Sequence, residues 1–110
     1  MSHRLRYKNI INRFKNKKIL VIGDLVLDHY IQGSVSRISP EAPVPVVLQN
    51  GSFYTPGGAA NVANNLSSLG AKVTVVGRIG DDIEGSILLR ELKKRKIHTN
   101  GIFVDKKMTT

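Results

Sequence analysis

Gly57-Gly58-Ala59-Ala60-Asn61-Val62-Ala63 is the most informative stretch of this chain. Two adjacent glycines follow Pro56, and apolar residues then recur at helical spacing until Gly70. The pattern predicts a helix over 59–69 that begins with side-chain-free backbone and outward-pointing N–H groups. Asn61 adds a donor and an acceptor in the first turn. The stretch therefore predicts a site for a polar, hydroxyl-rich or anionic small molecule, although two glycines alone are also typical of a tight turn.

The sequence around this stretch alternates between strand and helix patterns. Short β-branched runs predict buried strands over 18–22, 72–76 and 102–104. A second helix is expected over 83–95, with its N-cap in Gly80-Asp81-Asp82. Asn100-Gly101 indicates a turn before the last strand. This order predicts an α/β fold with a parallel sheet.

Two segments lie outside this alternation. Prolines interrupt strand-like sequence over about 30–55, which predicts a small β excursion away from the main sheet. Residues 1–16 are expected to form an amphipathic helix that docks on the domain formed by 17–110, with a membrane-surface role as the alternative. Its apolar stripe is Tyr7, Ile10, Ile11 and Phe14.

The composition excludes several classes of protein. The chain has 110 residues, no cysteine and no apolar run longer than Ile19–Ile22, which excludes a disulfide framework, a thiolate metal site and a membrane-spanning segment. The basic N-terminus lacks the apolar region of a secretory signal. We therefore expect one small domain, or part of a larger one, in the cytoplasm. His3, His29 and His98 lack the spacing of metal ligands, so no metal site is expected.

The net charge of +9 raises the question of nucleic-acid binding. Most of the basic residues lie at the flanks, because residues 1–23 hold seven of them and 93–96 hold four. Residues 24–92 carry four basic and seven acidic residues. The predicted site region is therefore mildly acidic, and we expect no nucleic-acid partner and no membrane partner.

Two carboxylates follow the first predicted strand. Asp24 and Asp28 stand in Gly23-Asp24-Leu25-Val26-Leu27-Asp28, at the strand end where open α/β sheets bind ligands. A carboxylate there accepts hydrogen bonds from sugar hydroxyls. The alternative is that both residues simply form turns or caps.

These motifs together resemble the N-terminal signature of the ribokinase-like (PfkB) carbohydrate kinases. Six residues separate Ala63 from Gly70 and nine separate Gly70 from Gly80, as in that signature. The stretch from Ser36 to Val47, Ser-Arg-Ile-Ser-Pro-Glu-Ala-Pro-Val-Pro-Val-Val, looks like the D-glycero-β-D-manno-heptose-7-phosphate 1-kinases, which serve ADP-heptose and lipopolysaccharide core synthesis. The resemblance covers residues 17–110.

The resemblance implies the N-terminal portion of a three-layer α/β/α sandwich with a small β lid at about 30–55. The sugar then lies between lid and sheet. Asp28 matches the aspartate that binds sugar hydroxyls, Gly57 and Gly58 match the backbone that approaches the sugar, and Asn61 matches the asparagine that hydrogen-bonds it. Arg37 is our own assignment for the heptose 7-phosphate, because an arginine fork suits phosphate.

The resemblance also implies ATP and Mg²⁺ as cofactors and a sugar phosphate as substrate. The catalytic base and most of the ATP site are expected beyond residue 110, so this chain alone is expected to be inactive. Family members often pair through the lid, which allows a homodimer. The alternatives are another sugar kinase of the same family and a non-catalytic sugar-binding or interaction module.

Overall fold

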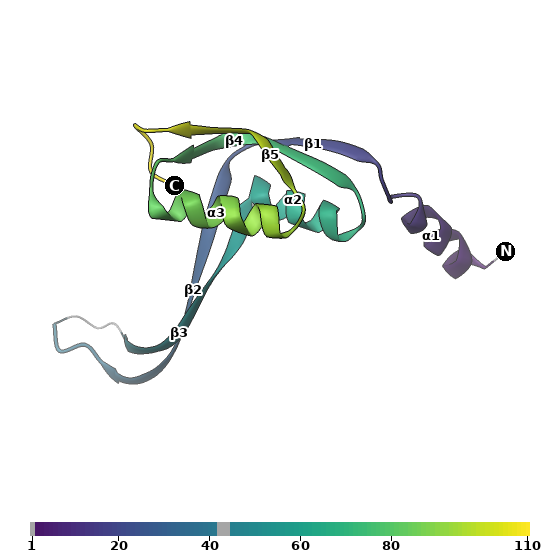
Figure 1. Ribbon diagram of the computed structural model, residues 1–110. Helices are drawn as coiled ribbons and strands as arrows, with labels where there is room; N and C mark the ends of the chain where they lie inside the picture. Colours follow the sequence, from purple (N-terminus) through teal and green to yellow (C-terminus); the bar gives the residue numbers. More distant parts are fainter. Residues whose placement is uncertain (1, 42–44) are drawn as a thin grey trace.

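The computed structural model describes residues 2–41 and 45–110 and places them in two sheets and three helices (Figure 1). The elements follow in the order α1 (His3–Asn12), β1 (Lys18–Ile22), β2 (Leu25–Ile38), β3 (Pro45–Gly58), α2 (Ala59–Ser68), β4 (Lys72–Gly80), α3 (Ile83–Lys94) and β5 (His98–Asp105). Strands β1, β4 and β5 form a parallel sheet in that order, and β2 pairs antiparallel with β3. The α/β fold with a parallel sheet is confirmed.

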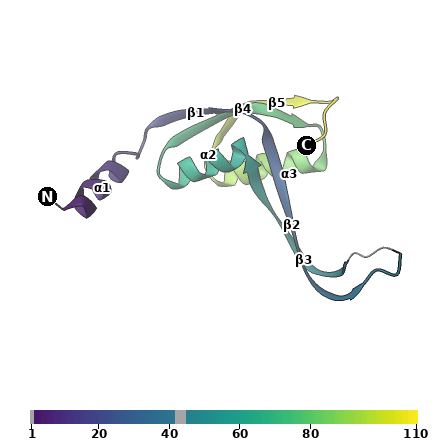
Figure 2. The same ribbon diagram turned by 180° about the vertical axis from the view of Figure 1, so that it is seen from behind.

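Helices cover one face of the parallel sheet, and a hairpin projects from its edge (Figures 1 and 2). Helices α2 and α3 lie on the same side of the β1-β4-β5 sheet in both views (Figures 1 and 2). The β2-β3 hairpin leaves the sheet at the end of β1 and extends well away from the body of the molecule. We call this hairpin the lid. It is longer than the sequence indicated, because its strands begin at Leu25 and end at Gly58.

The core lies between the sheet and its two helices. Its fully buried side chains come from one face of β4 and from the inward faces of α2 and α3: Val73, Val75, Ile79, Ala60, Ala63, Leu88 and Leu92. Burying a side chain of valine or leucine size stabilises a fold by about 1.5–3 kcal/mol. The alanines of α2 bring that helix close to the sheet, and this closeness fixes where its N-terminus lies.

Two strands differ from the sequence prediction. Strand β5 begins at His98, so Asn100-Gly101 lies inside a strand and the predicted turn is wrong. The register between β4 and β5 shifts between Thr74 and Val76, which accommodates these residues as an irregularity of the ladder. Strand β4 also continues to Gly80, because β5 pairs with its last residues. Strand pairing outweighs the local turn preference here.

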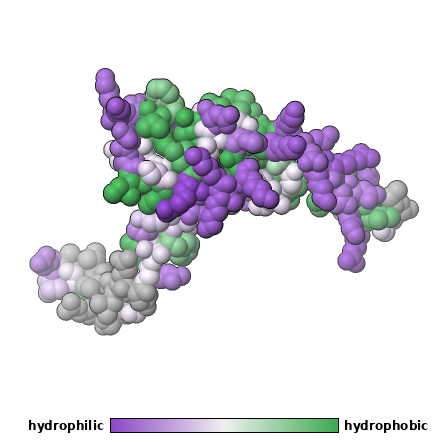
Figure 3. Space-filling view, in the orientation of Figure 1, coloured by the Kyte–Doolittle hydropathy of each residue, from purple (hydrophilic) through white to green (hydrophobic). Residues whose placement is uncertain are grey.

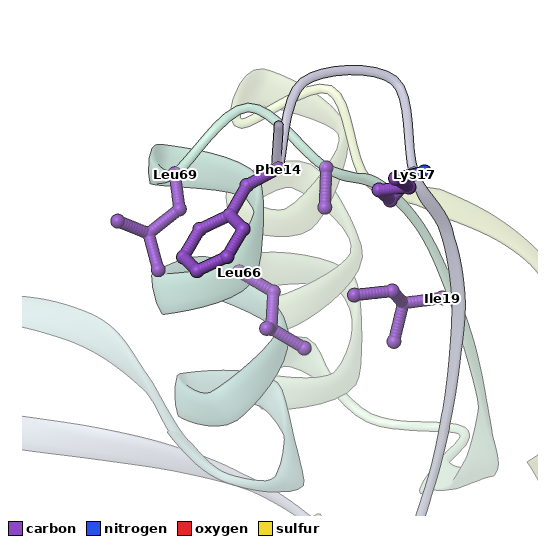
Figure 4. Close-up of a pocket in the computed structure, with 6 residues that line it drawn as sticks. Phe14, Lys17, Ile19, Leu66 and Leu69 are labelled. Atoms are coloured by element: carbon purple, nitrogen blue, oxygen red, sulfur yellow. The ribbon is translucent and has the colours of Figure 1, made fainter. Parts of the chain in front are cut away.

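Helix α1 forms as predicted, but it does not dock. None of its residues is buried. The N–H of Asn16 donates to the carbonyl oxygen of Gly70 at 2.9 Å, and the chain before it runs away from the sheet (Figure 1). Of the predicted stripe, Phe14, which follows the helix, lines an apolar cavity with Leu66 and Leu69 (Figure 4). The docking predicted for the whole stripe is therefore wrong, because no residue of α1 is buried.

The surface of this N-terminal arm is mostly hydrophilic, whereas hydrophobic residues gather over the body of the molecule (Figure 3). No helix in the described residues has both the length and the apolar character needed to cross a membrane. This arm, residues 2–16, holds much of the basic N-terminal flank and projects from the body of the molecule (Figure 1).

The sheet face opposite the helices carries exposed apolar side chains. Leu20 and Ile22 of β1 are 57% and 71% exposed, and Phe103 of β5 is 65% exposed. They share this face because alternate residues of a strand point the same way and Ile22, Val76 and Gly101 lie in register. Exposed apolar side chains that share a sheet face favour association.

We expect the 110-residue chain to self-associate through this face. The double substitution Leu20→Lys with Phe103→Lys should lower the mean sedimentation coefficient, because two charges on the face oppose its burial. Ile83→Lys is the matched control, since Ile83 is 75% exposed but lies at the start of α3. Sedimentation velocity at several concentrations measures the effect, and a sharp thermal transition of a monomeric wild-type chain would contradict it.

Candidate functional site

The main sheet, the lid and α2 meet at the C-terminal end of β1. The chain leaves the sheet at Asp24, runs out and back through the lid, and enters α2 at Gly58. Val26 pairs with Gly57 across the lid, and the N–H of Ala59 donates to the carbonyl oxygen of Asp24 at 2.8 Å. These contacts close the lid at its base. They place that base at the sheet edge where open α/β proteins bind ligands.

Gly58 is required at this junction for two reasons. Its φ is 57°, in the left-handed region that side chains disfavour. A Cβ at this position would also lie 2.7 Å from the carbonyl oxygen of Asp24. Gly58 has no side chain to cap α2, so the first-turn N–H groups that follow Ala59 are left for water or a ligand.

Asp28 lies directly over the side-chain-free Gly57. A Cβ on Gly57 would stand 2.5 Å from Oδ2 and 2.8 Å from Oδ1 of Asp28. Gly57 is buried and Asp28 is half-buried, so the carboxylate is held against backbone rather than turned into solvent. Within the described residues, no hydrogen bond or ion pair engages this carboxylate. Its oxygens are therefore free to accept hydrogen bonds from a ligand.

The structure says less about the other two predicted site residues, Asn61 and Arg37. Asn61 lies in the first turn of α2 and is exposed, so its amide is open to a ligand near the helix start. The backbone of Arg37 pairs with Val46 in the lid, but its side chain is outside the part of the structure that is described. The structure thus brings Asp28, Gly57 and Gly58 together and places Asn61 on the same helix start.

Two cavities lie at opposite ends of β1. The one at the C-terminal ends of β1 and β4 has a volume of about 360 Å³ and is lined by Asp24, Arg78 and Met108 among others. The apolar one in Figure 4 has a volume of about 140 Å³ and is formed by Phe14, Leu66 and their neighbours near the N-terminal end of β1. No predicted site residue lines the apolar cavity. The polar candidate site and the larger cavity share the C-terminal edge of the sheet.

A second cluster of polar groups lies at the C-terminal end of β4, where α3 begins and the chain after β5 returns. Oδ1 of Asp82 accepts hydrogen bonds from the N–H of Gly85 at 2.7 Å and from Oγ1 of Thr110 at 2.6 Å. Its Oδ2 accepts from the N–H of Thr110 at 2.8 Å. The Thr110 hydroxyl oxygen in turn accepts from the N–H of Gly80 at 2.8 Å. Asp82 therefore caps α3 and ties the chain after β5 to the end of β4.

The sequence indicated only part of this cluster. The N-cap role of Asp82 follows from its place before an apolar-periodic segment, and the structure confirms it. The bonds to Thr110 span 28 residues and leave no local pattern, so only the packed fold reveals them. The neighbouring ion pair between Arg78 and Asp105, at 3.4 Å, is solvent-exposed and adds little.

The hydrogen bonds from Thr110 hold the pKa of Asp82 below its ordinary value. The ionised carboxylate thus favours the folded state, and this stabilisation is complete near neutral pH and is lost as the pH falls below about 4. We expect Thr110→Val to lower the thermal midpoint at pH 7 by a few degrees and to flatten its fall between pH 5 and pH 3. Circular dichroism melts across this range measure both effects.

Thr109→Val is the control, because Thr109 is exposed and makes none of these bonds. The pKa of Glu91 is also lowered, by its hydrogen bond from Arg95, but this pair is unchanged in both variants. Equal pH profiles for the two variants would contradict the role given to Thr110.

The described residues include no group of three or more His, Cys, Asp or Glu side chains placed to hold a metal ion. The carboxylates nearest the site, Asp24 and Asp28, stand without a third acidic partner. We therefore assign no residue of this chain to a metal.

Comparison with known proteins gives consistent relatives. The model of the pfkB family of carbohydrate kinases matches residues 16–110. The chain is 54% identical over 94 residues to the bifunctional protein HldE of Helicobacter pylori strain J99, covering 86% of this chain and 20% of that protein. It is 53% identical over 102 residues to the bifunctional protein HldE of Gluconobacter oxydans, covering 92% and 21%. The chain thus spans about a fifth of the curated relatives it matches.

Solved structures share the same fold. Fructokinase from Xylella fastidiosa with bound ATP superposes with a TM-score of 0.64 at 30% identity, covering 86% of this chain and 28% of that one. Aminoimidazole riboside kinase from Salmonella enterica, complexed with its riboside and an ATP analogue, has a TM-score of 0.61 at 26% identity over 86% and 27%. The family match, these relatives and the glycine-based helix start agree, and the chain belongs to the pfkB family of carbohydrate kinases.

Proposed function

We propose that this chain supplies the sugar-binding part of an ATP-dependent kinase that phosphorylates the anomeric hydroxyl of D-glycero-β-D-manno-heptose 7-phosphate. The observation that carries the proposal is the Asp28 carboxylate held over Gly57 at the start of α2. Family membership supports a sugar substrate, and the HldE relatives and the Ser36–Val47 stretch favour a heptose phosphate.

The three contacts to the sugar have distinct roles in this proposal. The oxygens of Asp28 accept hydrogen bonds from two neighbouring hydroxyls, which a carboxylate does more strongly than a neutral acceptor. Gly57 and Gly58 let the sugar approach the backbone, where any Cβ would meet Asp28 or Asp24. Asn61 donates to and accepts from further hydroxyls at the helix start. Together they hold the acceptor hydroxyl in one orientation, which is the main requirement of phosphoryl transfer.

The lid supplies the remaining functions that we propose. Its two strands leave the sheet edge and extend away from the body (Figures 1 and 2), and closure over the sugar would keep out water that competes with the acceptor hydroxyl. Arg37 lies on the outer half of β2, where an arginine fork would suit the 7-phosphate. Pairing of two copies through the lid is consistent with this arrangement.

ATP and Mg²⁺ belong to the proposed reaction but not to the residues assigned here. ATP supplies the γ-phosphoryl group, and Mg²⁺ shields its charge. The described residues contain no carboxylate cluster that fits the metal. We therefore derive no step through these groups, and this chain's share of the reaction is to bind and orient the sugar.

The chain alone should bind heptose 7-phosphate without consuming ATP. Calorimetric titration should show saturable binding, with weaker binding of fructose 6-phosphate and ribose. Asp28→Asn should weaken binding at least about tenfold, because it removes a charged acceptor of two hydrogen bonds. Asp81→Asn, an exposed carboxylate away from the lid base, is the control. ATP turnover by the 110-residue chain would contradict the division of roles, and equal binding by Asp28→Asn would contradict the site.

Gly57→Ala tests the backbone approach directly. The new methyl group must displace the Asp28 carboxylate, so we expect sugar binding to fall about tenfold or more while the far-ultraviolet circular dichroism spectrum is retained. Gly51→Ala on the same strand is the matched control, because its Cβ would lie 3.4 Å from the Gln32 side chain, an ordinary contact. Wild-type affinity in Gly57→Ala would exclude this site.

A further inference from the structure

One face of the lid carries more than the proposed carboxylate. Within the regular part of the ladder, Val26 pairs with Gly57, Asp28 with Thr55 and Tyr30 with Phe53. Alternate residues of a strand point to the same face, so Asp28, Tyr30 and Phe53 share one side of the hairpin. Two residues along a strand span about 7 Å, which places the aromatic pair one sugar-sized step outward from the carboxylate.

The two rings form an exposed, parallel-stacked pair. The centroids of Tyr30 and Phe53 are 5.0 Å apart and their planes differ by 10°. Tyr30 is 51% exposed and Phe53 is 46% exposed, so neither ring belongs to the core. A stacked aromatic pair with half its surface in water is costly to leave uncovered in a small protein. The exposed pair lies on the same face of the lid as the carboxylate of Asp28, which is unbonded within the described residues. This indicates a surface that a ligand covers.

We propose that Tyr30 and Phe53 form a platform for the apolar C–H face of the bound sugar, while Asp28 binds hydroxyls on its edge. This inference rests on the proposed function and names two further specificity residues for it. A sugar ring has one chemistry on its faces and another on its edge, and small-molecule sites combine apolar surface with few polar groups in the same way. The platform and the carboxylate match these two chemistries side by side.

The platform also selects among sugars. A pyranose in a chair form whose C–H bonds gather on one face packs flat against the open face of a stacked aromatic ring. An axial hydroxyl on that face would lose its water without gaining a partner. Tyr30 and Phe53 therefore determine which sugar configurations bind, and Asp28 contributes most of the binding affinity.

The opposite face of the lid provides an internal control. His29 and Tyr54 are the neighbouring stacked pair, with centroids 4.2 Å apart, and by alternation they point away from Asp28. A variant of His29, which is exposed, changes the lid by a similar amount without touching the proposed platform.

Proton NMR of heptose 7-phosphate titrated with the 110-residue chain tests the platform. Wild-type protein should move the sugar C–H signals upfield through ring currents. Tyr30→Leu and Phe53→Leu should each weaken binding about fivefold and reduce that shift, because each keeps an apolar side chain but loses one of the two rings. Tyr30→Phe should restore both, and His29→Leu should match the wild type.

The outcomes separate this inference from the proposed function. If both leucine variants bind with wild-type affinity while Asp28→Asn does not, the platform is wrong and the sugar site stands. If the leucine variants instead dissociate a dimer in sedimentation velocity and leave sugar affinity unchanged, the rings are a contact between copies and the platform is also wrong. If the wild-type chain does not bind the sugar phosphate, both proposals fail.

Discussion

The rest of this structure depends on one short contact between backbones. The N–H of Ala59 donates to the carbonyl oxygen of Asp24, and the contact is possible only because Gly58 has no side chain and takes a positive φ. This contact joins the end of β1, the base of the lid and the start of α2. Any residue with a Cβ at position 58 would force these three elements apart.

The arrangement of the candidate site is a consequence of that closure. Once the base of the lid is closed, the pairing of Val26 with Gly57 places Asp28 over the backbone at the head of α2. A half-buried carboxylate, bare backbone and an uncapped helix then occupy one site at the edge of the sheet. The candidate site is thus built from backbone geometry, and in our proposal side chains add selectivity to it.

Much of this could be predicted from the sequence, because its signals are local. The glycine pair, the helices that follow it and the strand at 18–22 each carry their own pattern, and the structure has all of them. The docking of α1 was predicted wrongly, since none of its residues is buried. The turn at Asn100-Gly101 was predicted wrongly because pairing with β4 decides the conformation there. The Thr110 contacts and the shared face of Asp28, Tyr30 and Phe53 depend on long-range pairing, which no local pattern encodes.

The bonds of Asp82 have a consequence for how the molecule folds. The carboxylate of Asp82 caps α3 and also accepts hydrogen bonds from Thr110. The start of the helix is therefore bonded to the segment after β5. Helix α3 can form its first turn early, but its cap is fully satisfied only after β5 has joined the sheet. The last strand and the helix before it should therefore form and open as a single cooperative unit in hydrogen exchange.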